Sequence, residues 1–397
     1  MNNSRLNLFA PDIRANPYPS YAQLRRGPAL VQVDPFGLWA VHRHADIVSV
    51  LKNHQVFSCT GDEVLTRPAW LGRPNPFEQS MVMQDPPRHT RLRGLISRAF
   101  GPALLARLEP RLRAHVQRVT AELPANSPVN FAEAFSARIP TFVIGELLGL
   151  DASRHSDFRR WAVDMMAIGS TQEPERQAEI RASLVEMEDY LWSVLEDRRR
   201  APREDLVSDL LAVNAEGEKL TDAELLAFMS LLFVAALEAP TNVLSNSALV
   251  LARHPDVLAR LRADRSLIPR FVEEVLRYEP PSHAMMRFVR TETELDGVRL
   301  MPGTPLLLLL GSAFRDEAVY PEPERFDLDR GLQHNLTFGH GIHFCLGAAL
   351  SRLETRVALE VLVERFQAVS LGAEPVQWSL SFLSRGPTVL SLTLQPA

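Results

Sequence analysis

The 397-residue sequence has only two cysteines, Cys59 and Cys345. Two thiols are too few for a disulfide framework, and a reducing compartment would keep both as thiols. No apolar stretch reaches the roughly 20 residues that span a bilayer, and the first thirty residues lack the charged-then-apolar layout of a signal peptide. We therefore expect a cytoplasmic protein without a membrane anchor, in which one of the thiols could be a ligand.

An excess of positive charge is also missing. Lys and Arg number 43 against 48 Asp and Glu, so the formal net charge is -5, and no basic run is long enough to follow a phosphate backbone. Gly/Ser-rich linkers, charge blocks and repeats do not divide the chain. These absences make nucleic acid an unexpected partner and predict one domain over residues 1–397.

The hydrophobic pattern predicts a mainly helical α+β protein. Two β-type runs, residues 29–33 and 38–42, flank a turn signal and predict a hairpin in a β-rich part at about residues 25–60. Between about residues 85 and 285, apolar residues recur at helical spacing, as in Leu108, Leu112 and Val116. Strand signals return at about residues 286–310 and again near 380–394, so helix dominates and the sheets are minor.

The most apolar predicted helix begins at Thr221, which forms a capping-box signature with Glu224. Residues 225–237 are almost wholly apolar but too few to cross a membrane, and a helix that is apolar on every side must be buried on every side. We expect this helix to pass through the centre of the protein. Pro240 lacks the N–H that would bond to Ala236 and should kink it.

A loop at residues 338–347 compresses three glycines and Cys345 into a short segment directly before a helical pattern. Glycines let the backbone approach a flat ligand closely. A helix N-terminus lowers the pKa of a nearby thiol and stabilises its thiolate. The alternative for a lone cysteine is an inert buried side chain, but these neighbours favour a ligand.

The pattern Phe-x-x-Gly-x-His-x-Cys-x-Gly resembles the haem-binding loop of the cytochrome P-450 family; it is carried here by Phe338, Gly341, His343, Cys345 and Gly347. The resemblance extends from about residue 8 to residue 395. It implies a triangular helical prism with small antiparallel β-sheets, and haem b between the central helix and the loop. Cys345 would ligate the iron, and its negative charge would favour O–O cleavage.

Further motifs of the family follow in order. Glu274 and Arg277 stand three apart on one predicted helix face, and in the family such a pair joins an arginine of a Pro-Glu-Arg-Phe motif, here Arg325, in a buried structural network. The alternative is an exposed ion pair. The resemblance also assigns residues to the haem, whose buried propionates need charge-assisted donors: His89, Arg93, Arg287 and His343 for the propionates, with Phe338 and Gly347 beside the ring.

Residues 233–242 resemble the family's distal helix, where small residues leave room for dioxygen and an acid followed by an alcohol delivers protons. Glu238 supplies the acid, but Ala239 stands in place of the alcohol. Thr241 lies about 200° around the helix from Ala239 and is a poor substitute.

Three hypotheses address the missing alcohol. The preferred one is that a substrate hydroxyl or carbonyl, or a water held in the kink, replaces it. Peroxide could instead be the oxidant, although residues 220–251 lack the arginine that the family's peroxygenases place in this helix. The third is a rearrangement or cyclisation without conventional oxygen activation.

The resemblance places the substrate walls in about residues 61–83, in the central helix, in residues 281–286 and near residue 382. The pocket candidates are Phe77, Val82, Leu232, Ala235, Ala236, Ala239, Ala284, Met285 and Phe382. Ordinary core packing is the alternative for each of them. Apolar walls with methionines suit a bulky hydrophobic substrate such as a steroid, terpenoid or macrolide.

The chain has no flavin or dinucleotide fingerprint, so electrons from NAD(P)H should arrive through a separate ferredoxin or flavodoxin-type donor. A docking patch could be formed by Arg88, Arg91, Arg98, Arg352 and Arg356, although solvated helix faces explain them equally well. We expect a monomeric monooxygenase that uses dioxygen. The alternatives are a haem-based sensor or ligand carrier, or an interaction protein without a cofactor.

Overall fold

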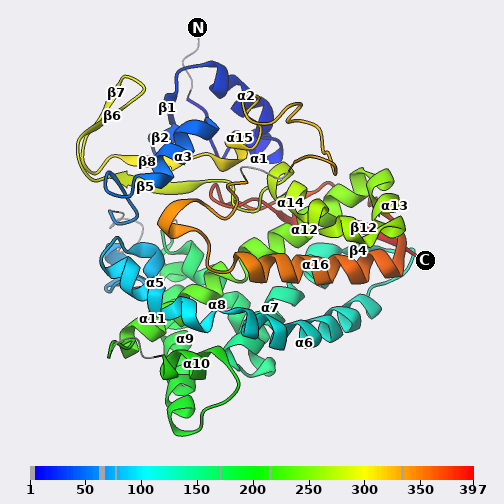
Figure 1. The fold of residues 1–397 in the computed structure, drawn as a ribbon, viewed down its shortest axis with the longest axis horizontal. Coiled ribbons are helices and arrows are strands. Elements are labelled where there is room, and N and C mark those ends of the chain that lie inside the picture. Colours follow the sequence, from blue (N-terminus) through cyan, green and yellow to red (C-terminus); the bar gives the residue numbers. More distant parts are fainter. Residues whose placement is uncertain (1–4, 62–67, 77, 170, 214–216, 332–334) are drawn as a thin grey trace. The chain divides into compact units, whose positions relative to one another are not determined.

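The computed structural model describes residues 5–61, 68–76, 78–169, 171–213, 217–331 and 335–397 (Figure 1). The chain divides into two compact units. The first unit comprises residues 1–58, 116–137 and 239–397, and the second comprises residues 59–115 and 138–238. Neither unit is a continuous stretch of chain, and the organisation as one domain stays a prediction.

A five-stranded sheet is the largest sheet of the first unit, in the order β1-β2-β8-β5-β3. Its strands are β1 (Leu30–Val33), β2 (Leu38–Val41), β3 (Phe57–Ser58), β5 (Met285–Val289) and β8 (Pro305–Leu308). β1 and β2 form the predicted antiparallel hairpin, with Leu30 opposite Val41. Most pairs are antiparallel as predicted, but β2 and β8 run parallel, an arrangement that the long stretch of chain between them permits.

Three smaller sheets also lie in the first unit. They are formed by β4 (Pro128–Asn130), β12 (Ser391–Pro396) and β9 (Phe366–Leu371), by β6 (Thr293–Leu295) and β7 (Val298–Leu300), and by β10 (Gln377–Trp378) and β11 (Pro387–Val389). The turn between β6 and β7 has φ of 48° at Asp296 and 76° at Gly297. Two successive positive φ values match the strand twist of a two-residue hairpin, which explains the Asp-Gly pair.

The first unit also contains helices. They are α1 (Pro11–Ala15), α2 (Tyr18–Arg26), α3 (His44–Lys52), α12 (Glu238–Arg253), α13 (Pro255–Ala263), α14 (Ile268–Tyr278), α15 (Leu310–Ala313) and α16 (Ala348–Arg365), with the short helical turns η3 (Ala132–Ser136), η5 (Arg265–Leu267) and η6 (Gly341–His343). One buried cluster joins Val243 of α12, Leu276 of α14 and Leu359 of α16. These three helices therefore share a core.

The second unit is helical. Its helices are α5 (Arg88–Ala99), most of α6 (Pro102–Ala121), α7 (Arg138–Leu148), α8 (His155–Ala167), α9 (Pro174–Arg200), α10 (Leu206–Ala212) and α11 (Asp222–Ala235), with the turns η1 (Ala69–Leu71), η2 (Met81–Met83) and η4 (Ala152–Arg154). Phe233 of α11 packs against Phe158 and Trp161 of α8, with ring centroids 5.4 and 5.5 Å apart. The predicted helix face at Leu108 and Leu112 is buried, as expected.

The predicted central helix is two helices. α11 opens with the predicted capping box, in which the Thr221 N–H donates to Glu224 Oε2 at 3.0 Å and the Glu224 N–H donates to Thr221 Oγ1 at 3.3 Å. α11 ends at Ala235, and α12 begins at Glu238. Pro240 lies in the first turn of α12, where its missing N–H is tolerated. The expected kink is therefore an interruption of the helix just before Glu238.

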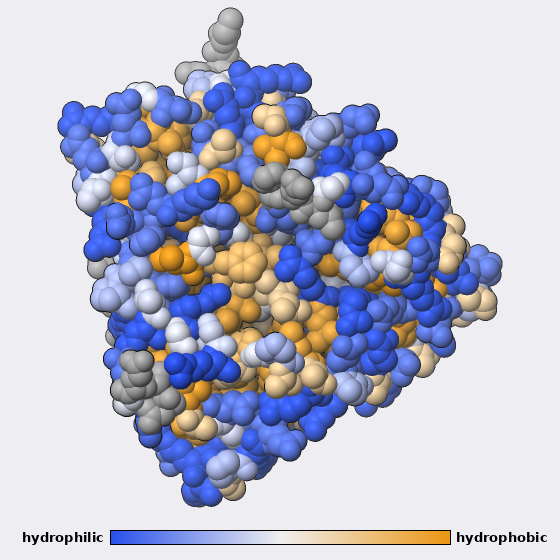
Figure 2. Space-filling view, in the orientation of Figure 1, coloured by the Kyte–Doolittle hydropathy of each residue, from blue (hydrophilic) through white to orange (hydrophobic). Residues whose placement is uncertain are grey.

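The prediction that the apolar helix is buried on every side is correct for most of α11. Its last residue, Ala235, is exposed. By length and composition alone, residues 222–253 together could cross a membrane. In the most apolar 18-residue stretch of this segment, however, 56% is buried inside the protein. One such segment is weak evidence for a span, since core helices share these properties. The face drawn in Figure 2 is largely hydrophilic, with apolar residues gathered near its centre.

Candidate functional site

The loop before α16 owes its shape to two glycines. Gly339 and Gly341 have φ of 74° and 73°, in the left-handed region that side chains avoid. A Cβ added at Gly341 would lie only 2.8 Å from the carbonyl oxygen of Leu51, at the end of α3. The Cys345 N–H donates to the carbonyl oxygen of Phe338 at 2.8 Å and closes the loop. The backbone thus closes the turn that carries Cys345, and Gly341 lies against the end of α3.

Cys345 itself is exposed, and α16 begins three residues later. A Cβ added at Gly347 would lie 3.9 Å from the Cys345 sulfur. The positive end of the helix favours the thiolate. An accessible sulfur at a helix N-terminus, on a loop of positive-φ glycines, fits a thiolate ligand to the iron of a flat cofactor.

Arg352 and Met285 of the first unit border this loop. Phe338 is buried beneath the guanidinium of Arg352, whose central carbon lies 4.4 Å from the ring centroid. A Cβ added at Gly339 would lie 3.7 Å from Met285 Cε, so β5 passes beside the cysteine loop. The structure therefore brings together Cys345, Phe338 and the pocket candidate Met285.

The proposed propionate ligands divide between the units. In the first unit, Arg287 on β5 is 9% exposed and donates from Nη1 to the carbonyl oxygen of Met286 at 2.7 Å, and His343 is half-buried at the end of η6. In the second unit, His89 is buried and Arg93 half-buried, four residues apart on α5. This spacing places His89 and Arg93 on one helix face.

The pocket candidates differ in burial. Among those of the first unit, Ala284 is buried in a core cluster, Met285 and Ala239 are half-buried, and Phe382 packs against Phe9 with ring centroids 5.7 Å apart. In the second unit, Leu232 and Ala236 are buried, whereas Ala235 and Val82 are exposed. Phe77 lies outside the described residues. Exposed apolar side chains suit a pocket wall, and the buried ones are equally consistent with core packing.

The buried network around α14 corrects one expectation. Glu274 receives two hydrogen bonds of 2.7 Å from Arg277, whose Nη2 also donates to the carbonyl oxygen of Arg325 at 3.1 Å. The Arg325 side chain, however, is 59% exposed and pairs with Asp327. Arg330, at 8% exposure, contacts Glu274 Oε1 at 3.3 Å instead. Both arginines belong to one short segment, and spacing alone could not show which of them turns inward.

Glu354 on α16 is a buried acid that sequence reasoning missed. Its side chain is 1% exposed, and Oε2 has no hydrogen-bond partner among the residues that the structure describes. Burial raises the pKa of Glu354 well above its usual range, because a charged carboxylate is poorly solvated there. The sequence gives no signal that Glu354 is buried, because it stands near Ser351, Arg352 and Thr355, and residues of these types usually face solvent.

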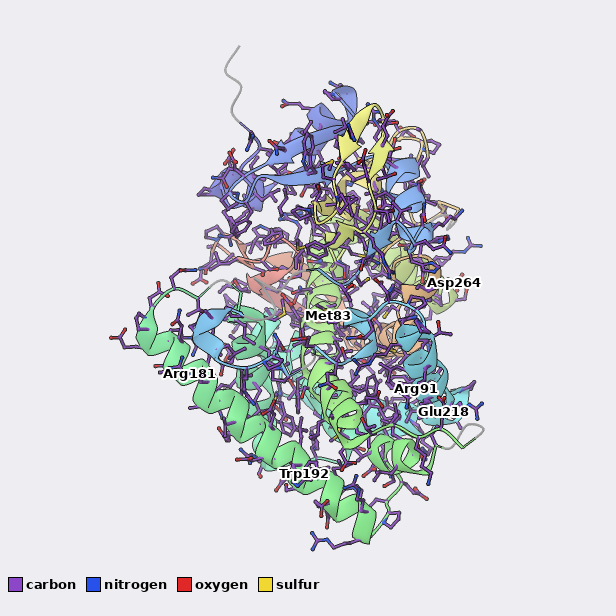
Figure 3. The ribbon with its side chains drawn as sticks, turned by 90° about the vertical axis from the view of Figure 1, so that its left-hand side faces the viewer. Met83, Arg91, Arg181, Trp192, Glu218 and Asp264 are labelled. Atoms are coloured by element: carbon purple, nitrogen blue, oxygen red, sulfur yellow. The ribbon has the colours of Figure 1, made fainter. Side chains whose placement is uncertain are left out.

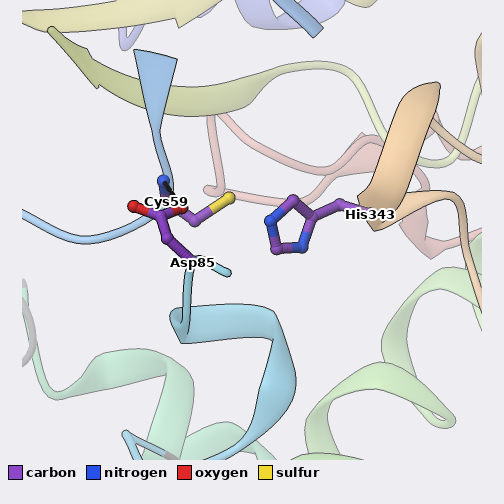
Figure 4. A group of neighbouring side chains, drawn as sticks. All are labelled: Cys59, Asp85 and His343. Atoms are coloured by element: carbon purple, nitrogen blue, oxygen red, sulfur yellow. Dashed lines mark hydrogen bonds between the residues drawn. The ribbon is translucent and has the colours of Figure 1, made fainter. Parts of the chain in front are cut away.

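The second cysteine has a structural environment. The Cys59 N–H donates to Asp85 Oδ1 at 3.2 Å (Figure 4). The Thr60 hydroxyl donates to Asp85 Oδ2 at 3.3 Å. Figure 4 also draws His343, on η6 of the first unit. Asp85 thus fixes the backbone that follows β3.

Most of the arginines predicted for a docking patch are already paired. Arg91 lies beside Glu218 (Figure 3), with Nε 3.0 Å from Glu218 Oε2, and its Nη1 lies 2.9 Å from Glu224 Oε1. Arg352 pairs with Glu273, and Arg356 with Glu360. Arg98 has no ion pair among the described residues. The local positive charge is therefore smaller than the arginine count predicts, which favours solvated helix faces.

Comparison with known proteins identifies the family. The chain matches the family model described as Cytochrome P450 over residues 175–382, and it belongs to the cytochrome P450 family. Vitamin D(3) 25-hydroxylase of Pseudonocardia autotrophica is 35% identical, covering 98% of this chain and 96% of its own. 6-Deoxyerythronolide B hydroxylase of Saccharopolyspora erythraea is 34% identical, covering 93% and 94%.

Solved structures agree with this assignment. Cytochrome P450 CYP109Q5 from Chondromyces apiculatus has a TM-score of 0.91 at 39% identity, with 99% of each chain covered. CYP109E1 from Bacillus megaterium in complex with testosterone has a TM-score of 0.85 at 28% identity, covering 95% of this chain and 99% of its own. The predicted fold is confirmed, and the chain is a cytochrome P450 monooxygenase. The family implies haem iron, a substrate, dioxygen and a redox partner.

Proposed function

We propose that this protein inserts one oxygen atom of dioxygen into a bulky hydrophobic molecule of the steroid, terpenoid or macrolide class, while the second oxygen leaves as water. The observation that carries the proposal is the exposed Cys345 thiol just before α16, on a loop whose Gly339 approaches Met285 of β5. Relatives named for vitamin D(3) and for 6-deoxyerythronolide B support bulky apolar substrates. The enzyme would act in the cytoplasm as a monomer.

Haem b, when bound, supplies the activation of dioxygen. Cys345 would hold the iron, and the propionates would receive hydrogen bonds from His89, Arg93, Arg287 and His343. Arg287 suits this role because it is largely withdrawn from solvent, where a charge-assisted hydrogen bond is strong. Phe338 and Gly347 would border the ring and exclude water from the sulfur.

Glu238 would pass protons toward the oxygen site. It is the first residue of α12, where the helix interruption leaves its side chain half-buried. Ala239 follows in place of the usual alcohol, so we propose that a substrate hydroxyl or carbonyl, or a water at the interruption, completes the relay.

An Ala239→Thr variant tests this relay. If substrate or water already replaces the alcohol, an added threonine competes with it, and less product should form per NADH oxidised than in the wild type. Product yield and NADH consumption are measured together. An unchanged or improved yield would contradict the proposed substitution.

Electrons from NAD(P)H would arrive through a ferredoxin or flavodoxin-type protein.

The second candidate function is a haem-based sensor, which the missing relay alcohol favours. The deciding experiment supplies the purified protein with ferredoxin, ferredoxin reductase, NADH, testosterone and ¹⁸O₂. An oxygenated steroid with one ¹⁸O atom is expected. If steroids, terpenoids and macrolides all bind but emerge unchanged, the sensor replaces the enzyme.

A further inference from the structure

A stripe of buried polar side chains follows α12 away from Glu238. Asn242, Ser245 and Asn246 are respectively 6%, 0% and 0% exposed. At about 100° per residue, these three and Glu238 lie within an arc of about 100° on one helix face. These four polar side chains thus follow one face of α12.

Each member of this stripe keeps one polar atom without a hydrogen-bond partner among the described residues. These atoms are Asn242 Nδ2, Ser245 Oγ and Asn246 Oδ1. Buried helical hydroxyls usually donate to the carbonyl four residues earlier, as Ser247 does to Val243 at 2.7 Å. Ser245 does not. Buried polar groups without protein partners are the usual sites of ordered water.

The far end of the stripe reaches a surface cavity. Asn246 Nδ2 donates to the carbonyl oxygens of Glu279 at 2.8 Å and Arg385 at 3.1 Å. Glu279 and Arg385 line a cavity of about 500 Å³, together with Arg253, whose side chain is 43% exposed. Glu279 and Arg385 therefore separate Asn246 from the solvent in this cavity.

The spacing of the stripe suits bridging water. Four residues of helix rise about 6 Å, the step from Glu238 to Asn242 and again from Asn242 to Asn246. One water between two hydrogen bonds of about 2.8 Å spans a similar distance. Asn242 cannot move far, because it packs against the backbone of Gly386, where an added Cβ would lie 2.1 Å from Asn242 Oδ1.

We propose that Asn242, Ser245 and Asn246 hold a chain of ordered waters that carries protons from the cavity at Glu279 and Arg385 to Glu238. This inference rests on the proposed monooxygenase function, in which NADH, a proton, dioxygen and substrate give NAD⁺, hydroxylated product and water. Each hop moves one proton between neighbouring oxygens, and Glu238 regains from the chain each proton that it passes on. Asn242 and Asn246 position the waters, and the Ser245 hydroxyl both donates and accepts.

The first test is a high-resolution crystal structure of the haem-loaded full chain. Ordered water should lie within hydrogen-bonding distance of Asn242 Nδ2 and Ser245 Oγ. A dry helix face, with these atoms turned onto protein acceptors, would overturn the proposal. The readout does not depend on turnover.

The second test compares Ser245→Ala with Ser247→Ala, two fully buried serines of the same helix. Testosterone is the probe, with ferredoxin, its reductase and NADH. Ser245→Ala should lower the ratio of oxygenated steroid to NADH severalfold, increase peroxide release and alter the solvent deuterium isotope effect on oxygen consumption. Ser247→Ala should match the wild type, because the Ser247 hydroxyl is bonded within the helix.

Equal behaviour of the two variants would overturn the water chain. If the wild type oxygenates no steroid, the proposed substrate class is wrong for testosterone. The isotope effect on NADH-driven oxygen consumption and the crystallographic waters then still test the chain of waters. A failure of the proposed substrate class can therefore be distinguished from a failure of the water chain.

Discussion

At the scale of the residue, Cys345 and Glu354 have opposite surroundings, although one lies just before helix α16 and the other within it. Cys345 is exposed at the N-terminus of α16, where the helix favours a negative sulfur. Glu354 lies within α16 and is buried, so its charged form is disfavoured. The helix end thus favours the charged form of Cys345, whereas burial favours the protonated form of Glu354.

Replacing Cys345 by serine tests the sulfur ligand. The hydroxyl is a weak ligand compared with a thiolate, so the reduced, carbon monoxide-treated Cys345→Ser protein should lose the strongly red-shifted Soret band expected of the wild type. Optical spectra provide the measurement, with Cys59→Ser as the matched control. The proposal fails if the wild type lacks this band or if Cys345→Ser retains it.

Glu354 should make stability depend on pH. Because its pKa is raised in the folded state, the folded protein holds a proton that the unfolded chain releases above the usual pKa of 4.5. The free energy of unfolding should therefore fall as pH rises above about 4.5, by at most about 1.4 kcal/mol per pH unit from this group. Glu354→Gln, which is neutral at all pH values, should lack this contribution.

Urea unfolding at a series of pH values gives the comparison. The free energy of unfolding of Glu354→Gln should exceed that of the wild type by an amount that grows with pH. Parallel curves for the two proteins would show that the carboxyl has an ordinary pKa.

At the scale of the element, α14 is fixed to the segment before the cysteine loop by the Glu274 network. Arg277 donates to three carbonyl groups of that segment and its surroundings, those of Phe314, Pro323 and Arg325. Arg330 adds an ion pair with Glu274 and donates to the carbonyl oxygen of Pro321 at 2.6 Å. Side-chain hydrogen bonds and an ion pair, rather than strand pairing, thus hold α14 against this irregular segment.

Arg330→Gln and Arg325→Gln form a matched pair that tests this connection. Loss of the Arg330 cation leaves Glu274 partly uncompensated in a buried position and should cost about 2–4 kcal/mol of unfolding free energy. Arg325→Gln removes an exposed ion pair and should cost less than about 1 kcal/mol. Denaturant unfolding measures both, and equal losses would place Arg325 in the network after all.

Local signals in the sequence predicted several elements, whereas distant pairings escaped prediction. The β1–β2 hairpin and the Thr221 capping box depend on neighbouring residues and were predicted. The parallel pairing of β2 with β8 joins strands far apart in sequence, and the inward turn of Arg330 depends on tertiary packing. Pattern and spacing carry no information about either. The motif around Cys345 is likewise compact, which is why its loop could be recognised.

At the scale of the whole molecule, the two units are interleaved along the chain, and the candidate haem residues come from both. Cys345, Arg287 and His343 belong to the first unit, and His89 and Arg93 to the second. A ligand that binds the folded protein stabilises it in proportion to its affinity. Haem that binds the folded chain should therefore stabilise it against unfolding.

Withholding haem should lower the Tm of the full chain. Calorimetry of protein expressed with and without haem supply measures the difference, and Cys345→Ser should show a smaller one. A colourless protein that melts at the same temperature under both conditions would indicate an interaction protein without a cofactor.

The close approach of Gly341 to the end of α3 decides where the sulfur's surroundings can be redesigned. With Leu51 only 2.8 Å from an added methyl group and φ at 73°, even alanine at 341 would dislodge the loop. At Gly347 the same methyl group would touch the Cys345 sulfur at 3.9 Å, an ordinary van der Waals contact. A mutational library aimed at shielding the sulfur should hold position 341 constant and begin at position 347.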